Sequence, residues 1–274
     1  MPRSSLWSRI AASSVSGPAL LFFLVAATTA AQAGACPTST SDIATDRPDV
    51  TNSSLVVPVG SLQNENGINT TGQGPKKSID GTNSRWRLGV APCLEILVDL
   101  PNYVGGLKGG ADSGFTDVSP AVKWQFSSLP EQWNLSMTAG AGLPTGASRI
   151  AGSGVQPYLQ FPWSHDLGGG WGTSGMFTTF FSPSDPSNHQ TTQATFVLER
   201  QVTERASLFV EYVATYPDRG GSVDLINSGG TFVLTKTQQI DFHVAFGLNR
   251  NSPDYIVGVG YSIRFDGLFR TSAR

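Results

Sequence analysis

Histidine and cysteine side chains are the first residues to weigh for chemistry, because they supply general bases, nucleophiles and metal ligands. His165 lies beside Asp166 in a predicted turn, and His189 lies in a predicted loop. The third histidine, His243, stands two residues after Asp241 in an alternating segment. These positions assemble no nucleophile with a base and an orienting carboxylate, and they lack the spacing of a metal site. The sequence therefore predicts no catalytic residue, no metal, no cofactor and no enzymatic activity.

Charged residues on the polar faces of alternating segments form a second informative set. Charges that share an enclosed face must pair with one another or stay hydrated. One interpretation is a salt-bridge network that braces a narrow barrel, and the other is that the same network fixes a constriction and selects what passes. Both can hold together. The set comprises Glu65, Arg87, Glu95, Asp99, Lys123, Glu199, Glu211, Asp241 and Arg264.

The elements that must position these charges are clearest near the end of the chain, in YIVGVGYSIRF (residues 255–265). Large apolar or aromatic residues occupy every second position, and the residues between them are mostly small or polar. Strict alternation predicts a β-strand with one apolar and one polar face. The stretch that ends at Phe265 also resembles the terminal-strand signal read by the barrel-assembly machinery. Unlike many proteins with that signal, this chain continues past the phenylalanine with DGLFRTSAR.

Alternation recurs along most of the chain and predicts twelve strands in all. An even number lets both ends of a barrel wall finish on the periplasmic side. Short connections alternate with longer ones rich in Gly, Ser, Pro and Asn, such as GQGPKKSIDG (residues 72–81). The other eleven segments are residues 61–71, 86–90, 94–100, 115–126, 133–143, 155–163, 171–181, 191–202, 206–216, 223–235 and 239–248.

The amino-terminal residues predict export. Arg3 and Arg9 precede a short apolar run, and Ala31-Gln32-Ala33 is typical of a signal-peptidase site. Without residues 1–33 the chain has 16 basic and 20 acidic residues, a net charge of −4. This balance carries no electrostatic signature of nucleic-acid binding. Charged residues make up only 14% of the chain, below the roughly 25% of soluble domains.

Two classes fit an exported, glycine-rich β-protein: a secreted sandwich and an outer-membrane barrel. The polar faces carry many Gly, Ser, Thr and Gln residues but few lysines, which favours a lumen over a solvent-exposed surface. Aromatic residues near strand ends resemble the interfacial girdles of a barrel in lipid. We therefore predict an all-β, antiparallel up-and-down transmembrane barrel of the bacterial outer membrane. The aromatic residues are Trp86, Trp124, Trp133, Trp163, Trp171, Tyr212, Tyr216, Tyr255 and Tyr261.

Several short motifs resemble those of one protein family and occur in the same order. The first is TDRPDVTNSSLVVPVGSLQNENGIN (residues 45–69), and the last is PDYIVGVGYSIRF (residues 253–265). Between them lie CLEILVDLPNY, GLPTG, FVEY and QIDFHVAFGLN. The resemblance is to the MetA-pathway-of-phenol-degradation family of outer-membrane transporters. It implies a β-barrel and a transporter-like role, and it implies little about the substrate.

The segment before the first strand is neither good barrel wall nor a good free tail. Pro48 and Pro58 lack the amide donor that strand pairing needs, and residues 55–57 (LVV) would be exposed in a free tail. We expect a plug at the periplasmic mouth, with a narrowing effect on the pore. Arg47 would meet acidic members of the nine charged residues listed above, called the lumen set (Glu95, Glu199 or Asp241). Asp46 or Asp49 would meet Arg87 or Arg264. The expected organisation is a signal peptide (1–33), this segment (34–60), the barrel (61–265) and a tail (266–274).

The two cysteines, Cys36 and Cys93, are expected on the same side of the membrane in an oxidising compartment. A disulfide between them would tether the amino-terminal segment to the barrel. Lipidation of Cys36 and free thiols are the alternatives.

The function that these observations predict is a channel or transporter for small hydrophobic or aromatic compounds. The alternative is a structural or lipid-acting enzymatic barrel with a closed lumen. Three lumen aromatics, Tyr158, Phe180 and Phe209, are candidates for stacking on a solute, or for simply filling the interior. The expected partners are membrane lipid, a small-molecule solute and the barrel-assembly machinery during biogenesis, with no nucleic acid.

Overall fold

The computed structural model of this protein describes residues 42–126, 132–151, 154–184 and 189–268. All regular structure in these ranges is β-strand. No helix in the described part of the chain is long and apolar enough to cross a membrane. The predicted signal peptide and Cys36 lie outside the described residues.

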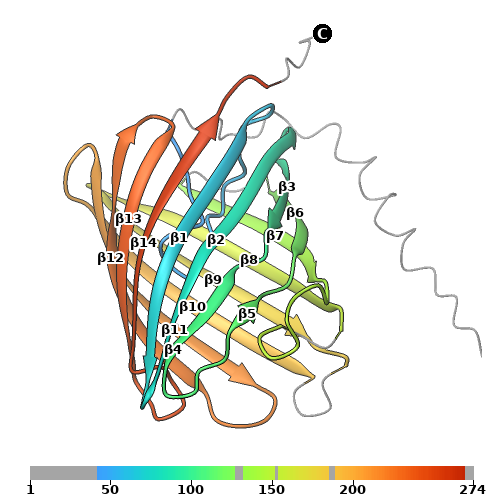
Figure 1. Ribbon diagram of the computed structural model, residues 1–274. Helices are drawn as coiled ribbons and strands as arrows, with labels where there is room; N and C mark the ends of the chain where they lie inside the picture. The colour runs from blue at the N-terminus through green and yellow to red at the C-terminus, as the bar shows by residue number, and fades with distance from the viewer. Residues whose placement is uncertain (1–41, 127–131, 152–153, 185–188, 269–274) are drawn as a thin grey trace, which may run out of the picture. The chain divides into compact units, whose positions relative to one another are not determined.

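The strands form one antiparallel sheet that closes on itself (Figure 1). Each strand pairs mostly with its neighbours in sequence, and β1 pairs with both β14 and β2, which joins the two edges. The strands are β1 (Leu62–Gln73), β2 (Lys76–Ala91), β3 (Leu94–Asp99), β4 (Tyr103–Lys108), β5 (Gly114–Phe115), β6 (Ser119–Gln125), β7 (Trp133–Gly142), β8 (Gln156–Gly168), β9 (Trp171–Phe181), β10 (Gln190–Gln201), β11 (Ala206–Pro217), β12 (Val223–Thr235), β13 (Gln238–Gly247) and β14 (Tyr255–Phe265).

Two of the wall strands are interrupted, so the fourteen strands make twelve passages across the wall. β3 and β4 both pair with β2, at Arg85–Ala91 and Lys77–Gly81 respectively. They therefore act as one strand broken at residues 100–102, where Pro101 lacks an amide donor. β5 and β6 form a second broken strand. The prediction of a twelve-stranded up-and-down barrel is confirmed.

One predicted loop is wrong. Residues 72–81 were expected to form a long connection, but β1 and β2 pair almost to their ends and only Gly74 and Pro75 separate them. Gly74 has a φ of 55°, a left-handed conformation that suits glycine in so tight a turn. The polar residues around the turn can pair as strands because neither face of this outer hairpin has to be apolar.

The two faces of the wall differ as the alternation predicted. On β14, Val257 and Val259 are 47% and 58% exposed on the outer face, whereas Ser262 and Arg264 are buried inside. On β13, Phe242 is exposed on the outside and Asp241 is buried. A closed wall with apolar side chains outside and polar side chains inside is the arrangement of a barrel in lipid.

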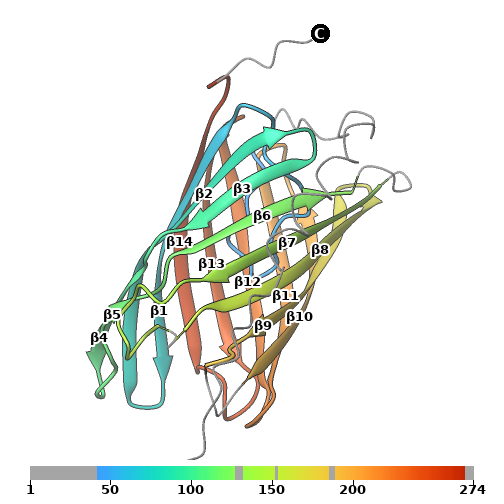
Figure 2. The same ribbon diagram turned by 90° about the vertical axis from the view of Figure 1, so that its right-hand side faces the viewer.

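Residues 42–60, called the lumen segment from here on, run inside the ring of strands (Figure 1, Figure 2). Ile43, Val56 and Val57 are each buried. The segment joins the wall at Val59, which forms an isolated parallel bridge with Gly89 of β2. The wall needs glycine there, because a Cβ on Gly89 would lie 2.2 Å from the Pro58 carbonyl oxygen.

Candidate functional site

The backbone of the lumen segment is held by wall carboxylates rather than by strand pairing. A buried N–H group needs an acceptor, and a charged acceptor gives the stronger bonds. Three wall glutamates, from β1, β3 and β11, provide these acceptors. The bonds run from Asp46 N to Glu65 Oε2 (2.9 Å), Val50 N to Glu211 Oε2 (3.0 Å), Thr51 N to Glu211 Oε1 (2.9 Å) and Val57 N to Glu95 Oε2 (2.6 Å).

Asp46 is the most heavily paired residue of the segment. Its carboxylate lies 2.9 Å from Arg85 Nη1, 3.3 Å from Arg87 Nη1 and 3.1 Å from Lys123 Nζ. Burial alone would raise the pKa of Asp46, but the three cations outweigh burial and hold the pKa below its usual range. Asp46 therefore stays ionised in mild acid and ties the segment to β2 and β6.

The cations around Asp46 are themselves built into the wall. Arg87 is fully buried and donates two bonds to Glu95, at 3.0 and 3.1 Å, and one to Glu65, at 3.1 Å. Its remaining donors reach the carbonyls of Ala44 (3.1 Å) and Leu55 (2.8 Å) in the segment. A buried guanidinium with all of these bonds satisfied is a rigid anchor.

Arg47 points the opposite way and pairs with Asp241 of β13, at 3.2 Å. Two glycines in the wall leave room for the Arg47 side chain. A Cβ on Gly67 of β1 would lie 2.2 Å from Arg47 Cζ, and one on Gly260 of β14 would lie 2.4 Å from Arg47 Nε. Larger residues at these two positions would therefore displace Arg47 from the wall.

The turn after Arg47 is held more lightly. Glu211 accepts bonds from the amides of Val50 and Thr51 and a third from Thr51 Oγ1, at 2.8 Å. Among the described residues, neither Glu211 nor Asp49 has an ion-pair partner. Burial and the carboxylates of Glu211 and Glu199 raise the pKa of Asp49 well above its usual value.

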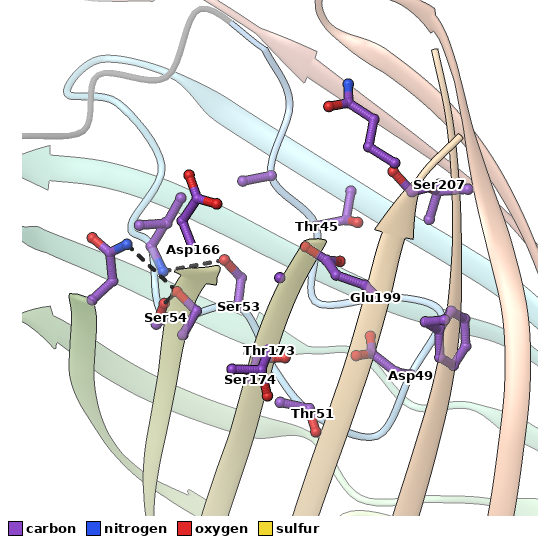
Figure 3. A pocket seen from close by; sticks show the side chains of 18 of the residues that line it. Thr45, Asp49, Thr51, Ser53, Ser54, Asp166, Thr173, Ser174, Glu199 and Ser207 are labelled. Carbon is purple, nitrogen blue, oxygen red and sulfur yellow. Dashed lines mark hydrogen bonds between the residues drawn. The ribbon is translucent and has the colours of Figure 1, made fainter. Parts of the chain in front are cut away.

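Two cavities flank this turn inside the barrel. One, of about 580 Å³, lies toward the short connections and includes residues of the β8–β9 turn. Figure 3 shows Asp49 and Glu199 among the residues that line it. The other, of about 630 Å³, is lined by outer parts of the wall such as residues 99–102 and 116–119. Arg47, Pro48, Asp49 and Asn52 line both cavities, so this part of the segment separates them.

The structure brings four of the nine predicted charged residues together in one cluster and places the other five elsewhere in the lumen. Glu65, Arg87, Glu95 and Lys123 share one buried cluster with Asp46. The remaining members lie outside that cluster. Asp99 pairs with Arg85 (2.6 Å), Asp241 pairs with Arg47, Glu211 binds the Val50–Thr51 backbone, Glu199 lines the smaller cavity, and Arg264 pairs with Asp266 (2.8 Å) and donates to the Asp42 carbonyl (3.1 Å).

Sequence reasoning missed Arg85. The strand was predicted to begin at Trp86, which assigned Arg85 to a loop, whereas β2 begins at Lys76. The signal was present, because Arg85 stands two residues before Arg87 and period-2 alternation places both on the same face. The short predicted strand, rather than the residue type, caused the omission.

The cysteines and aromatic residues are placed as follows. Cys93 is disulfide-bonded, and because Cys36 lies outside the described residues, its pairing stays a prediction. Tyr158 and Phe209 are buried in the lumen, and the Tyr158 and Phe180 rings lie 6.0 Å apart. Phe209 lines the smaller of the two cavities described above, whereas Tyr158 and Phe180 line neither of these two.

Comparisons with known proteins agree with this architecture. A family model described as "Putative MetA-pathway of phenol degradation" matches residues 45–265. An outer membrane channel from Pseudomonas putida F1 is similar in structure, with a TM-score of 0.60 and 14% identity over 77% of this chain and 97% of that one. The NanC porin has a TM-score of 0.54 (8% identity, 74% and 98% coverage), and the KdgM porin crystallised with oligogalacturonate has 0.52 (7% identity, 75% and 99% coverage). Among curated proteins, no significant match was found.

Proposed function

We propose that this chain, which belongs to the MetA-pathway-of-phenol-degradation family, is an outer-membrane channel for small aromatic compounds. Its fold is shared with outer-membrane channels and porins, which supports passage of a solute rather than catalysis. Lipid contacts the apolar outer face, and the solute enters the polar interior. The barrel-assembly machinery would insert the barrel into the membrane.

The observation that carries this proposal is the pair of cavities on the two sides of the lumen segment. Volumes of about 580 and 630 Å³ fall in the range of small-molecule sites. A solute that crosses the barrel would pass from one cavity to the other beside Pro48 and Asp49. The lumen segment is therefore the constriction of the path, and its displacement would open the path.

The charged cluster has two roles in this proposal. It braces the wall, and it holds the lumen segment in the position that narrows the pore. The members of the lumen set that contact the segment, the segment residues Asp46 and Arg47, and a Cys36–Cys93 disulfide would act to keep the segment in place. Residues 1–33 would be the signal peptide, and residues 266–274 would be a tail outside the barrel.

The test is solute flux through the purified barrel in lipid vesicles. Replacing residues 45–54 with Gly and Ser keeps the chain length but removes the side-chain contacts that these residues make with the wall. We expect higher single-channel conductance and faster phenol uptake. The control replaces Asp218 and Arg219, the residues of the β11–β12 loop (218–222) that are not already Gly or Ser, and should leave both rates unchanged. A folded wild-type barrel that passes neither ions nor phenol would contradict the proposal.

A further inference from the structure

A belt of hydrogen-bonded side chains follows the inner face of the wall beside the larger cavity. Glu211 accepts from Asn227 Nδ2 (2.8 Å), and Asn227 Oδ1 lies 3.2 Å from His243 Nδ1. On the other side of the ring, His243 Nε2 lies 3.2 Å from Asn69 Oδ1, and Asn69 Nδ2 donates to Asp80 Oδ1 at 3.2 Å. The belt therefore runs from β11 through β13 to β2 and passes over the junction between β14 and β1.

The centre of this belt is open because of a glycine. Gly258 pairs with both His243 and Asn69, so the three residues form one row across β13, β14 and β1. A Cβ on Gly258 would lie 2.2 Å from both His243 Nε2 and Asn69 Oδ1. The two side chains meet above the space that glycine leaves, and both line the larger cavity.

The carboxylates at the ends of the belt fix the orientation of both amides. Glu211 and Asp80 accept hydrogen bonds, so each asparagine turns its NH₂ group to a carboxylate and its oxygen to His243. A neutral imidazole donates one hydrogen bond only. Asn227 is buried and does not line the cavity, so its oxygen takes the Nδ1 proton. At the cavity, His243 Nε2 and Asn69 Oδ1 then face each other as two acceptors.

The charges around His243 favour the neutral ring. The Arg47 guanidinium lies against Gly260, two residues from Gly258, and would face a positive imidazolium. Each nearby carboxylate already accepts at least one hydrogen bond from a group other than His243. Asp241 binds Arg47, Glu211 binds the lumen segment and Asn227, and Asp80 accepts from Asn69, Asn83 (2.6 Å) and Asn102 (3.1 Å). The proton that the acceptor pair lacks is therefore best supplied by a donor in the cavity.

We propose that His243 Nε2 and Asn69 Oδ1 form a binding site for the hydroxyl group of a neutral aromatic alcohol of the phenol class. The hydroxyl donates between the two acceptors, and Pro48, Val50 and Ile256 supply apolar lining for the ring. This inference rests on the proposed function and adds a selection rule to it. The channel distinguishes an aromatic hydroxyl donor from a ring of the same size that cannot donate.

The test compares phenol with anisole, its methyl ether, which has no donor. The full-length protein carries ¹⁵N-labelled histidine in detergent micelles, with His165→Gln and His189→Gln to leave one histidine signal. We expect phenol to shift the His243 Nε2 resonance and to bind about tenfold more tightly than anisole, the effect of one hydrogen bond. Equal binding and equal shifts for the two compounds would overturn the proposal, and would show that water or nothing occupies the site.

Two variants separate this site from general effects on the barrel. Asn69→Leu keeps the side-chain size but removes the acceptor, so it should abolish the preference for phenol over anisole. Gln73→Leu on the outer hairpin is the matched control and should keep the preference. Conductance is recorded on the same proteins. A conducting barrel without the preference refutes the acceptor pair alone, whereas a barrel that binds phenol but never conducts refutes the channel.

Discussion

Two of the contacts that anchor the lumen segment use opposite kinds of chemistry. At Asp46 a carboxylate of the segment is surrounded by three wall cations. Four residues later the arrangement reverses, because the segment contributes backbone N–H groups and the wall contributes Glu211, with no cation in contact. The first anchor depends on paired buried charges, whereas the second depends on a few hydrogen bonds next to two cavities.

This difference indicates where the segment can move. Removing one partner of a buried ion pair costs about 3–5 kcal/mol, because the remaining charge is left uncompensated. Each of the three hydrogen bonds from the turn to Glu211 contributes about 1.5–3 kcal/mol, and each can break singly without separating an ion pair. The Asp46 anchor should therefore hold while the Val50–Thr51 turn opens. A turn that moves by itself would widen the passage between the cavities without releasing the whole segment.

The largest expected effect comes from Asp46→Asn. Three cations would lose their common partner, and docking of the segment should weaken by about 3–5 kcal/mol. The check is hydrogen–deuterium exchange of the Val57 amide, which donates to Glu95 and should lose its protection, together with a rise in conductance. Asp42→Asn is the control, because only the backbone carbonyl of Asp42 makes a described contact with the wall. An unchanged Val57 exchange rate in the folded variant would show that Asp46 is not the stronger of the two anchors.

A smaller and more local effect is expected from Glu211→Gln. The amides of Val50 and Thr51 lose a charged acceptor, so their exchange should be about 10- to 100-fold faster while Val57 stays protected. Glu199→Gln is the control, because Glu199 lines the cavity beside the turn but has no described bond to the segment. If Val50 and Val57 lose protection together, the two anchors open as one unit, and the turn does not move independently of Asp46.

The smallest effect is a pH dependence of the weaker anchor. The raised pKa of Asp49 means that the docked segment binds a proton that an undocked Asp49 releases above pH about 4. Docking of the turn is therefore favoured at low pH and weakens as pH rises toward that raised pKa. Asp46, with its lowered pKa, stays ionised over the same range.

The measurement for this third prediction is conductance between pH 7 and pH 5. Conductance should fall as the pH is lowered, and Asp49→Asn should remove this dependence. Asp42→Asn serves again as the control and should keep the wild-type profile. A pH profile that is unchanged in Asp49→Asn would assign the titration to another group.

The barrel could be predicted from the sequence because a period of two repeats in every wall strand. Alternation places an apolar residue outward whatever its neighbours are, so residues 255–265 report the lipid face directly. The strand ends beyond the lipid carry no such constraint, and for that reason the β1–β2 hairpin was read as a loop. The breaks at residues 100–102 and 116–118 depend on side-chain bonds such as Asn102 to Asp80, which no periodicity reveals.

The site was only partly predictable, for a related reason. The alternation of side chains along a strand identifies which charged residues face the lumen, but it does not identify the partners of those residues. Pairing depends on which strands face each other across the barrel and on where the wall is thin enough to admit a side chain. Gly67 and Gly260 decide the position of Arg47, and as single glycines in a glycine-rich chain they do not stand out.

The distribution of the anchors along the chain sets an order of events during biogenesis. Asp46 needs Arg87 of β2 and Lys123 of β6, whereas Arg47 needs Asp241, which lies 194 residues later in the sequence. The lumen segment cannot reach all of its partners until β13 has joined the wall. The lumen segment precedes every wall strand in the sequence, and it is therefore among the last parts of the chain to settle.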